Sequence, residues 1–353
     1  MKKPWSDKLR QAVPYAPGEQ TSDRDVIKLN ANENPYPPSP KVVEAIRQFP
    51  AEKLCLYPRI TASPLVETLA EYHGLKKEQV FVANSSDEVL AFCFQAFFHS
   101  QKPVFFPDLS YTFYPVWCDL FGVPYEQKPV GEDFRIRLSD YAPENGGVIL
   151  PNPNAPTSLA EGPDFLRALL QENQDVIVII DEAYVDFSPY SALELLDEFE
   201  NLVVIRTFSK SRSLAGLRVG AAYGSEELIA LLNAVKGSYN PFTLDSIALA
   251  AATASIQDED YFRQCIEKVK ATRTRSQAAL EEMGFVVLPS QTNFLFVTHP
   301  DFSAEAIYHA CNDHDIFIRY FKQPRLENYL RITIGTDAQM DHLFAFLHEY
   351  LQR

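Results

Sequence analysis

The stretches DVIVIIDEAY (residues 175–184) and NLVVIRTFSK (residues 201–210) are both apolar runs of β-formers that end in polar side chains. The same pattern occurs at QVFVANSSDE (79–88), PVFFPDLSY (103–111), GVILPNPN (147–154) and RVGAAYG (218–224). Each run has the length of one buried strand, and helix-like periodicity follows the turn. Strands that alternate with helices predict an α/β fold with a mostly parallel sheet between helices, over roughly residues 60–250.

A different pattern follows in the last third of the chain. A helical stretch at residues 258–284 is followed by short alternating strands at 285–289, 293–298, 316–321 and 329–335, and by an amphipathic helix at 337–353. This order predicts a second, smaller α+β domain. The opening LNANENPYPPSP (29–40) is too rich in Pro and Asn for a core element, so we expect it to wrap over other parts. The predicted division is therefore a segment at 1–45 that packs over the active site and the small domain, a large domain at 46–250 and a small domain at 251–353.

The composition limits the possible partners. With 47 acidic and 32 basic side chains among 353 residues, the chain has a formal charge of −15. A charge of this sign repels nucleic acid, so we expect small-molecule substrates and no nucleic-acid partner. The sequence contains no signal-peptide core and no apolar run of about 18 residues, so we expect a cytoplasmic protein without a membrane contact. The five cysteines and seven histidines lack metal-ligand spacing, and neither disulfides nor a metal site are expected.

Lys210 and Asp181 follow two of the apolar runs, where the carboxyl ends of parallel strands place ligand sites. Taken alone, Lys210 fits a solvated turn residue and Asp181 fits a helix cap. Asp181 also resembles the metal-binding acid of a nucleotide-hydrolysing enzyme, but that function requires a GxxxxGK[ST] loop and the sequence contains no Gly-Lys dipeptide. The two residues together suit a pyridine cofactor, because the acid can pair with a protonated ring nitrogen and the amine can hold an aldehyde as a Schiff base.

Polar residues near the other strand ends can supply a phosphate site. Ser85, Ser86 and Asp87 open a strongly apolar helix, and the N–H groups and dipole of a helix amino terminus attract anions. Each of these signals is weak alone, since Ser-Ser-Asp is also a good helix cap. Two hydroxyls and an arginine near Lys210 belong to the same candidate set: Thr207, Ser209 and Arg218. Two further strand ends add the amide of Asn154 and the aromatic ring of Tyr111.

Nine motifs in this order resemble the fold-type I aminotransferases that use pyridoxal 5′-phosphate, and within them the histidinol-phosphate aminotransferase family. The resemblance covers essentially the whole chain. It is carried by PYAPG (14–18), LNANENP (29–35), LYPR (56–59), SDEVLAF (86–92), SYTFYP (110–115), PNAPT (153–157), DEAYVDF (181–187), TFSKSRSLAGLRVG (207–220) and IRYFKQPRLENYLRITIGT (318–336). It implies the fold-type I architecture, with a large domain whose mostly parallel sheet lies between helices and a smaller α+β domain.

The resemblance also implies a role for each matching residue. Lys210 would bind the cofactor as a Schiff base and move the substrate proton, Asp181 would keep the pyridine nitrogen protonated, and Tyr184 would hydrogen-bond the phenolic oxygen. Implied cofactor contacts are Ser86, Asp87, Tyr111, Asn154, Thr207, Ser209, Arg218 and, from the partner subunit of a homodimer, Tyr57. Implied substrate contacts are Tyr15, Asn32, Glu33, Arg319 and Arg331.

The implied reaction is a transamination in histidine biosynthesis between histidinol phosphate and 2-oxoglutarate, which gives imidazole-acetol phosphate and glutamate. Two other reactions with the same cofactor remain open, an aromatic amino acid transamination and a decarboxylation like that of threonine phosphate. A third hypothesis, a regulator that senses a ligand, would need a DNA-binding module before the first motif. We do not expect one, because only about 30 residues precede the first motif-rich segment. The sequence departs from the family at Ser85 and Ser158, where the family usually has glycine, so each turn must tolerate a side chain.

Overall fold

A seven-stranded sheet forms the centre of the larger part of the molecule in this computed structural model, which describes residues 3, 5–6, 9–10, 12–14, 26–141 and 144–352. The spatial order is β2-β8-β7-β6-β5-β3-β4, and all neighbours are parallel except β8, which runs antiparallel to β2 and β7. The strands are β2 (Val80–Asn84), β3 (Val104–Pro107), β4 (Tyr125–Lys128), β5 (Gly147–Pro151), β6 (Val178–Asp181), β7 (Leu202–Thr207) and β8 (Val219–Gly224).

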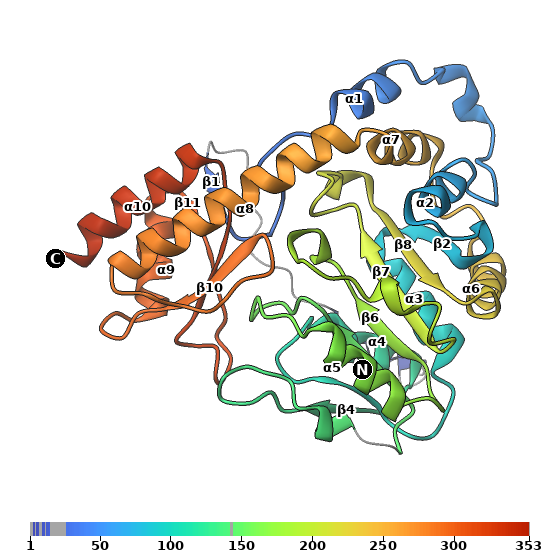
Figure 1. The fold of residues 1–353 in the computed structure, drawn as a ribbon, viewed down its shortest axis with the longest axis horizontal. Helices are drawn as coiled ribbons and strands as arrows, with labels where there is room; N and C mark the ends of the chain where they lie inside the picture. Colours follow the sequence, from blue (N-terminus) through green and yellow to red (C-terminus); the bar gives the residue numbers. More distant parts are fainter. Residues whose placement is uncertain are drawn as a thin grey trace.

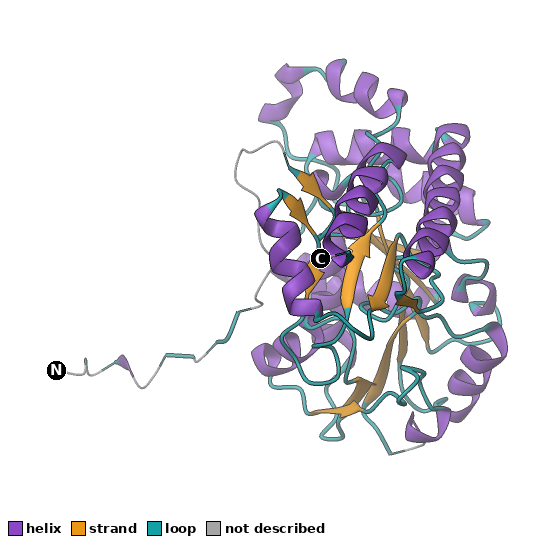
Figure 2. Ribbon diagram, turned by 90° about the vertical axis from the view of Figure 1, so that its left-hand side faces the viewer, coloured by secondary structure: helices purple, strands orange, loops and turns teal. Residues whose placement is uncertain are grey.

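Helices cover both faces of this sheet, as Figure 2 shows. The helices of this part are α1 (Pro40–Arg47), α2 (Leu65–His73), α3 (Ser85–Phe97), α4 (Phe113–Phe121), α5 (Pro163–Glu172), α6 (Glu226–Tyr239) and α7 (Ser246–Ile256). Of these, α1 packs on α7 and not on the sheet itself (Figure 1). Short 3₁₀ turns lie at Ala51–Cys55, Lys77–Gln79, Leu138–Tyr141, Val185–Phe187, Ala192–Leu195 and Ala215–Leu217.

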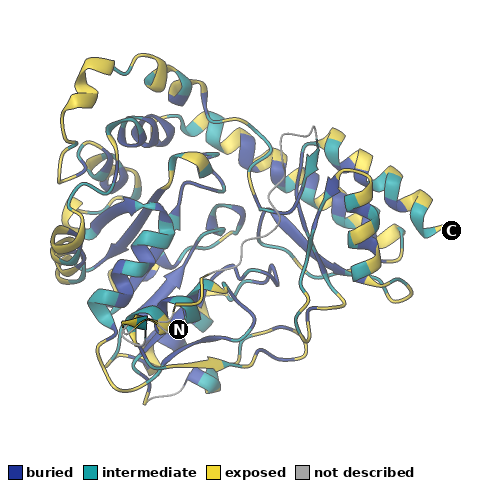
Figure 3. Cartoon of the chain, turned by 180° about the vertical axis from the view of Figure 1, so that it is seen from behind, coloured by how far each residue is buried: buried dark blue, intermediate teal, exposed yellow. Residues whose placement is uncertain are grey.

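Two apolar cores explain why the central strands read as continuous hydrophobic runs. Successive side chains of a strand point to opposite faces, so Val178 and Ile180 enter one core while Ile179 enters the other. Both faces are covered, and the strands are buried throughout (Figure 3). The edge strand β4 lacks this signal because its residues are mostly exposed and polar, and the sequence pattern did not predict it.

The smaller part of the molecule contains an antiparallel sheet in the order β12-β13-β10-β9 and a parallel pair of β1 and β11. These strands are β1 (Ile27–Lys28), β9 (Val286–Val287), β10 (Phe294–Thr298), β11 (Ile316–Phe317), β12 (Arg319–Tyr320) and β13 (Leu330–Thr333). They pack on α8 (Glu259–Glu282), α9 (Ala304–Asp313) and α10 (Asp337–Leu351) around a third apolar core. Figure 1 shows α8 running from α7 beside the large sheet into this smaller part.

The segment after β1 connects the two parts of the molecule. Leu29 N donates to Phe317 O and Leu29 O accepts from Thr333 N, which fixes the segment to the smaller part. Asn34 Nδ2 donates to Ser211 O, which joins it to the loop that carries Lys210. The α/β architecture with a smaller second domain is as predicted, whereas the domain boundaries at residues 45 and 250 remain predictions. None of the helices in the described part of the chain has the length and apolar character needed to span a bilayer.

Candidate active site

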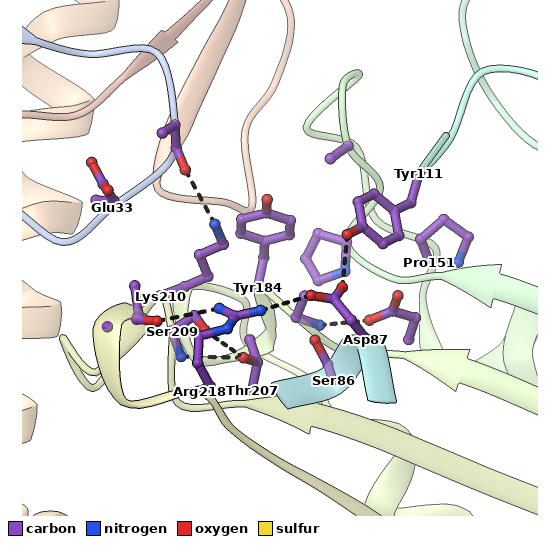
Figure 4. A pocket seen from close by; sticks show the side chains of 17 residues that line it. Glu33, Ser86, Asp87, Tyr111, Pro151, Tyr184, Thr207, Ser209, Lys210 and Arg218 are labelled. Atoms are coloured by element: carbon purple, nitrogen blue, oxygen red, sulfur yellow. Dashed lines mark hydrogen bonds and ion pairs between the residues drawn. The ribbon is translucent and has the colours of Figure 1, made fainter. Parts of the chain in front are cut away.

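A cavity of about 410 Å³ lies at the carboxyl ends of the parallel strands. Pro151, Asp181 and Thr207 line it, and they are the last residues of β5, β6 and β7. This is the edge where an open α/β sheet binds ligands. Figure 4 shows Lys210, Tyr184, Tyr111, Ser86, Asp87, Ser209 and Arg218 around the same space. The structure therefore brings together most of the residues that the sequence singled out.

Lys210 lies in the turn between β7 and β8. Its Nζ donates a hydrogen bond of 3.1 Å to Ala31 O, and it lies 6.0 Å from the centre of the Tyr184 ring. The Ala31 carbonyl comes from the segment after β1, so that segment lines the cavity. Among the described residues this carbonyl is the one hydrogen-bond partner of the amine, which is therefore accessible to an electrophile in a ligand-sized cavity.

Asp181 is a buried carboxylate at the floor of the cavity. Its Oδ2 accepts a 2.8 Å hydrogen bond from the Tyr114 hydroxyl, and its Oδ1 accepts a 3.2 Å bond from Ala183 N. Burial raises the pKa of Asp181 to about 6, because the ionised form loses hydration that these two hydrogen bonds replace only in part. No ion pair among the described residues engages it. The next residue, Glu182, is different, because Arg206 Nε pairs with it at 3.0 Å.

The first turn of α3 forms a cup for an anion. Gly220 of β8 packs directly beneath it, where a Cβ atom would lie 2.3 Å from Ser85 C and from Ser86 N. Only glycine permits this approach. Ser86 and Asp87 line the cavity there, opposite Thr207 and Ser209.

Asp87 holds two other residues of the site. Its Oδ2 lies 2.7 Å from Arg218 Nη2, and its Oδ1 accepts a 2.8 Å hydrogen bond from the Tyr111 hydroxyl (Figure 4). The Arg218 side chain is 44% exposed, so this pair is screened by water and the guanidinium can still turn toward an anion in the cup. The cavity thus combines a helix amino terminus and an arginine with an amine and a buried acid.

A second cavity of about 700 Å³ adjoins the first and shares six lining residues with it: Ala31, Glu33, Tyr111, Ala155, Tyr184 and Lys210. Arg319 of β12 and Arg331 of β13 line it and stand directly opposite each other in the antiparallel ladder. Like charges at such positions repel. A pair of this kind is suited to binding one anionic group with both guanidinium forks.

Phe321 and the segment after β1 hold these two arginines. The guanidinium groups lie 5.2 Å (Arg319) and 5.5 Å (Arg331) from the Phe321 ring centre, and Arg331 Nη2 donates to Asn30 O at 2.8 Å. Arg331 thus faces the second cavity from a fixed position.

Asn32 and Glu33, two of the residues predicted for the substrate side, also line the second cavity. The Glu33 carboxylate pairs with Lys28 Nζ at 2.8 Å, and Lys28 lines this cavity as well. The basic side chains around the second cavity outnumber the acidic ones among the described residues, since Lys322 lines it too.

Two of the described residues predicted for the site, Asn154 and Tyr57, line neither cavity. Asn154 is buried behind the lining residues Pro153 and Ala155, and its Nδ2 donates to Leu109 O and Thr157 Oγ1 at 2.9 and 3.1 Å. Tyr57 is 83% exposed and stacks on Phe242 with ring centres 4.6 Å apart. Tyr15 lies outside the described residues.

Both serines at the family's glycine positions adopt the left-handed backbone conformation. The φ angle is 71° at Ser85 and 65° at Ser158. Ser85 Oγ bonds Asp87 Oδ2 at 3.3 Å, and Ser158 Oγ bonds Pro289 O at 3.1 Å. The turns therefore keep the geometry that glycine would favour while carrying a side chain.

The sequence reasoning missed Tyr114 and the Ala31 carbonyl. Tyr114 lies three residues after Tyr111, a spacing that could have placed both rings on one side of the chain, but nothing local indicates that it reaches Asp181, 67 residues away. The Ala31 carbonyl could not be predicted from a side-chain pattern, because it is a backbone atom 179 residues from Lys210.

Comparison with known proteins agrees with this geometry. A family model described as "Aminotransferase class I and II" matches residues 24–347. The chain belongs to the class I and II aminotransferase family. This class I and II aminotransferase is 47% identical over 348 residues to the histidinol-phosphate aminotransferase of Lactococcus lactis subsp. cremoris (strain MG1363), and the match covers 99% of this chain and 98% of the relative.

Solved structures share the fold of this class I and II aminotransferase. Histidinol-phosphate aminotransferase from Sinorhizobium meliloti in complex with pyridoxal-5′-phosphate is 27% identical, with a TM-score of 0.84 over 93% of this chain and 92% of that chain. L-threonine-O-3-phosphate decarboxylase from Porphyromonas gingivalis is 20% identical, with a TM-score of 0.79 over 93% of this chain and 100% of that chain. The second likeness shows the fold alone. The predicted family and the fold-type I architecture are confirmed.

Proposed function

We propose that the protein is a pyridoxal-phosphate-dependent transaminase that moves the amino group of histidinol phosphate to 2-oxoglutarate, giving imidazole-acetol phosphate and glutamate in histidine biosynthesis. The observation that carries the proposal is that Lys210 and Asp181 face one cavity, which opens into a second cavity lined by Arg319 and Arg331. The 47% identity to a histidinol-phosphate aminotransferase over nearly the whole chain supports this substrate in preference to those of other members.

The residues of the first cavity fit pyridoxal phosphate. Asp181 is a buried acid without a cationic partner among the described residues, and a protonated pyridine nitrogen would supply one. Ser86, Asp87, Thr207, Ser209 and Arg218 would hold the phosphate. Tyr111 would stack on the ring, and Tyr184 would donate to the phenolic oxygen. We keep Asn154 as a proposed contact to that oxygen, because its two neighbours in the chain line the cavity.

When bound, pyridoxal phosphate supplies an aldehyde that condenses with amines and a ring that withdraws electrons from the substrate Cα. Lys210 would hold the cofactor through its Nζ and, once displaced by substrate, would carry the proton between the substrate Cα and the cofactor C4′. The Ala31 carbonyl, which already accepts a hydrogen bond from this Nζ, would then hold the free amine in place. The Asp181 carboxylate would keep the proton on the pyridine nitrogen throughout.

Arg319 and Arg331 would select the substrates. Histidinol phosphate carries a phosphate where glutamate carries a carboxylate, so one pocket must accept both anions. Two guanidinium groups on neighbouring strands can bind either group with paired hydrogen bonds. We infer that Tyr15, Asn32 and Glu33 lie over the substrate from the segment that precedes the first helix.

We also infer that the enzyme is a cytoplasmic homodimer. The strong exposure of Tyr57 fits a side chain that contributes to the site of a partner subunit, where its hydroxyl would donate to the cofactor phosphate.

A half-reaction tests the proposal directly. Histidinol phosphate, added to the yellow protein without an amino acceptor, should convert the visible absorbance to that of the amine form of the cofactor. 2-Oxoglutarate should then restore the original spectrum. Release of CO₂ in place of this cycle would indicate a decarboxylase, and an equal response to phenylalanine would indicate an aromatic aminotransferase.

A further inference from the structure

Asn32 and Thr333 form a buried hydrogen-bonded pair beside Tyr184. Asn32 N donates to Thr333 Oγ1 at 3.0 Å, Thr333 Oγ1 donates to Asn32 Oδ1 at 3.1 Å, and Asn32 Nδ2 donates to the Tyr184 hydroxyl at 2.9 Å. Asn32 and Thr333 are 1% and 2% exposed, so water does not compete for the two bonds between them. Asn32 holds a left-handed backbone, with φ of 56°, and its carbonyl accepts from Asn293 Nδ2 at 3.0 Å.

The backbone N–H of Asn32 is the starting point for assigning the directions of these bonds. A backbone N–H can only donate, so the Thr333 oxygen must accept from Asn32 N and its own proton must point elsewhere. That proton needs an acceptor because the hydroxyl is buried, and its one other partner among the described residues is the side-chain amide of Asn32 at 3.1 Å. An amide oxygen that faces Thr333 satisfies it. The NH₂ of the same amide then faces Tyr184 and donates to it.

The hydrogen bond from Asn32 Nδ2 orients the Tyr184 hydroxyl. Its oxygen accepts from Asn32, and none of the residues that the structure describes accepts a hydrogen bond from its hydroxyl. Tyr184 lines both cavities, and its ring lies 6.0 Å from Lys210 Nζ (Figure 4). The hydroxyl proton is thus left to point into the space where the cofactor is proposed to lie.

We propose that Thr333 and Asn32 are positioning residues that turn the Tyr184 hydroxyl proton toward the phenolic oxygen of pyridoxal phosphate. The inference rests on the proposed function, since it requires that cofactor. Thr333 and Arg331 lie on the same face of β13, two residues apart. Strand β13 would therefore bind the substrate anion through Arg331 and, through Thr333, also carry the first of the hydrogen bonds that orient Tyr184.

Substitutions of Thr333 test this inference. Thr333→Val keeps the shape but removes the hydroxyl, so the Asn32 amide can turn and present its oxygen to Tyr184. Thr333→Ser keeps the hydroxyl. The matched control is Thr253→Val in α7, because the Thr253 hydroxyl is also buried but donates only to Leu249 O of its own helix. The backbone bonds of Thr333 to Leu29 and to β10 do not depend on its side chain.

Two measurements are needed, neither of which is turnover: the dissociation constant of the cofactor, and the ratio of its protonated and unprotonated absorbance bands at one neutral pH. Thr333→Val should weaken cofactor binding by about threefold to tenfold, as expected for loss of one hydrogen bond, and should increase the protonated band. Tyr184→Phe should shift the band ratio in the same direction. Thr333→Ser and Thr253→Val should resemble the wild type in both measurements.

The double variant separates positioning from structure. In the Tyr184→Phe background there is no hydroxyl to orient, so adding Thr333→Val should change neither measurement further. An equal effect of Thr333→Val in both backgrounds, or an unchanged band ratio in the wild-type background, would overturn the inference. A protein that binds no pyridoxal phosphate, or that attaches it to a lysine other than Lys210, would refute the proposed function itself.

Discussion

Asp181 destabilises the fold when it is ionised, although its carboxylate is a central group of the candidate active site. Burial without a neighbouring cation destabilises the ionised form of this side chain. The pKa of Asp181 is therefore raised from 3.8 to about 6. Residues placed for chemistry often carry such a cost. A bound pyridinium would remove it, so the free energy lost in the cofactor-free protein becomes available for cofactor binding.

The destabilisation caused by the buried Asp181 carboxylate predicts that the stability of the cofactor-free protein depends on pH. Between pH 3.8 and about 6 the native state holds a proton on Asp181 that the unfolded state has released, so the free energy of unfolding falls as the pH rises through this window. The loss amounts to about 3 kcal/mol once Asp181 is ionised in both states. Asp181→Asn should remove this dependence and stabilise the cofactor-free protein by about 1–3 kcal/mol at neutral pH. Denaturant unfolding at several pH values measures it, and a difference between the two proteins that is constant with pH contradicts it.

The same substitution should have the opposite effect on catalysis. Asparagine matches the size of Asp181 but lacks the charge that would retain the pyridine proton. We expect the rate to fall at least about a hundredfold, which corresponds to about 2.7 kcal/mol of barrier. Steady-state turnover with saturating cofactor measures the effect. Near-normal turnover would mean that Asp181 is only a structural acceptor for Tyr114.

Lys210 permits a direct chemical test. Lys210→Ala should leave a folded protein that binds the cofactor without the visible absorbance of the lysine adduct and has negligible turnover. Borohydride reduction of the wild type, followed by proteolysis and mass spectrometry, should locate the cofactor on the peptide that contains Lys210. Labelling at any other lysine would refute the assignment.

At the scale of elements, the ends of β6 and β7 were predictable because their apolar runs give way to polar residues, at Asp181 in β6 and at Arg206 and Thr207 in β7. Parallel pairing then brings these ends to one edge of the sheet. Strand β4 was not predictable, because an exposed edge strand has no hydrophobic pattern. The contacts from Ala31 to Lys210 and from Tyr114 to Asp181 were not predictable either, because they depend on how distant segments meet after folding.

The strands β12 and β13 carry a prediction about specificity. Arg331→Ala should weaken the binding of histidinol phosphate and of glutamate alike, by about tenfold to a hundredfold, because a charge-assisted contact to either anion is lost. Michaelis constants for both substrates test this. Arg263→Ala is the matched control, since it removes the same charge from an exposed position on α8. Selective loss of one substrate would show that the two anions bind at different places.

The phosphate group itself is part of this prediction. Unphosphorylated histidinol lacks the charge that Arg319 and Arg331 would bind, so it should be a poor substrate. If histidinol reacts as well as its phosphate ester, the substrate assignment is wrong while the transaminase assignment stands.

At the scale of the whole molecule, exposed apolar side chains gather around Tyr57. Leu54, Leu56, Tyr57 and Ile60 are all more than half exposed in the segment between α1 and α2, and Tyr239 at the end of α6 is 74% exposed. Figure 3 shows this region as an exposed part of the chain. Apolar surface of this kind favours association, and a two-fold dimer would bury it.

The proposed dimer predicts that each site uses Tyr57 of the other subunit. A mixed dimer of one Tyr57→Phe chain and one Lys210→Ala chain would then contain one site with both lesions and one site with neither. We expect half the activity of the wild-type dimer and one tightly bound cofactor per dimer. Chains with different affinity tags allow this species to be isolated, and turnover and cofactor content can be measured on it.

The two parent homodimers make the result decisive. The Lys210→Ala homodimer should be inactive, and the Tyr57→Phe homodimer should retain activity but bind cofactor more weakly, because the phenol would donate a hydrogen bond to the phosphate. If Tyr57 acted within its own chain, the mixed dimer would have one lesion in each site. Its activity would then be half that of the Tyr57→Phe homodimer, with equally weak cofactor binding. That outcome, or a monomer with full activity, would remove the shared site, whereas a site of wild-type strength built from two defective chains can arise only when the subunits exchange Tyr57.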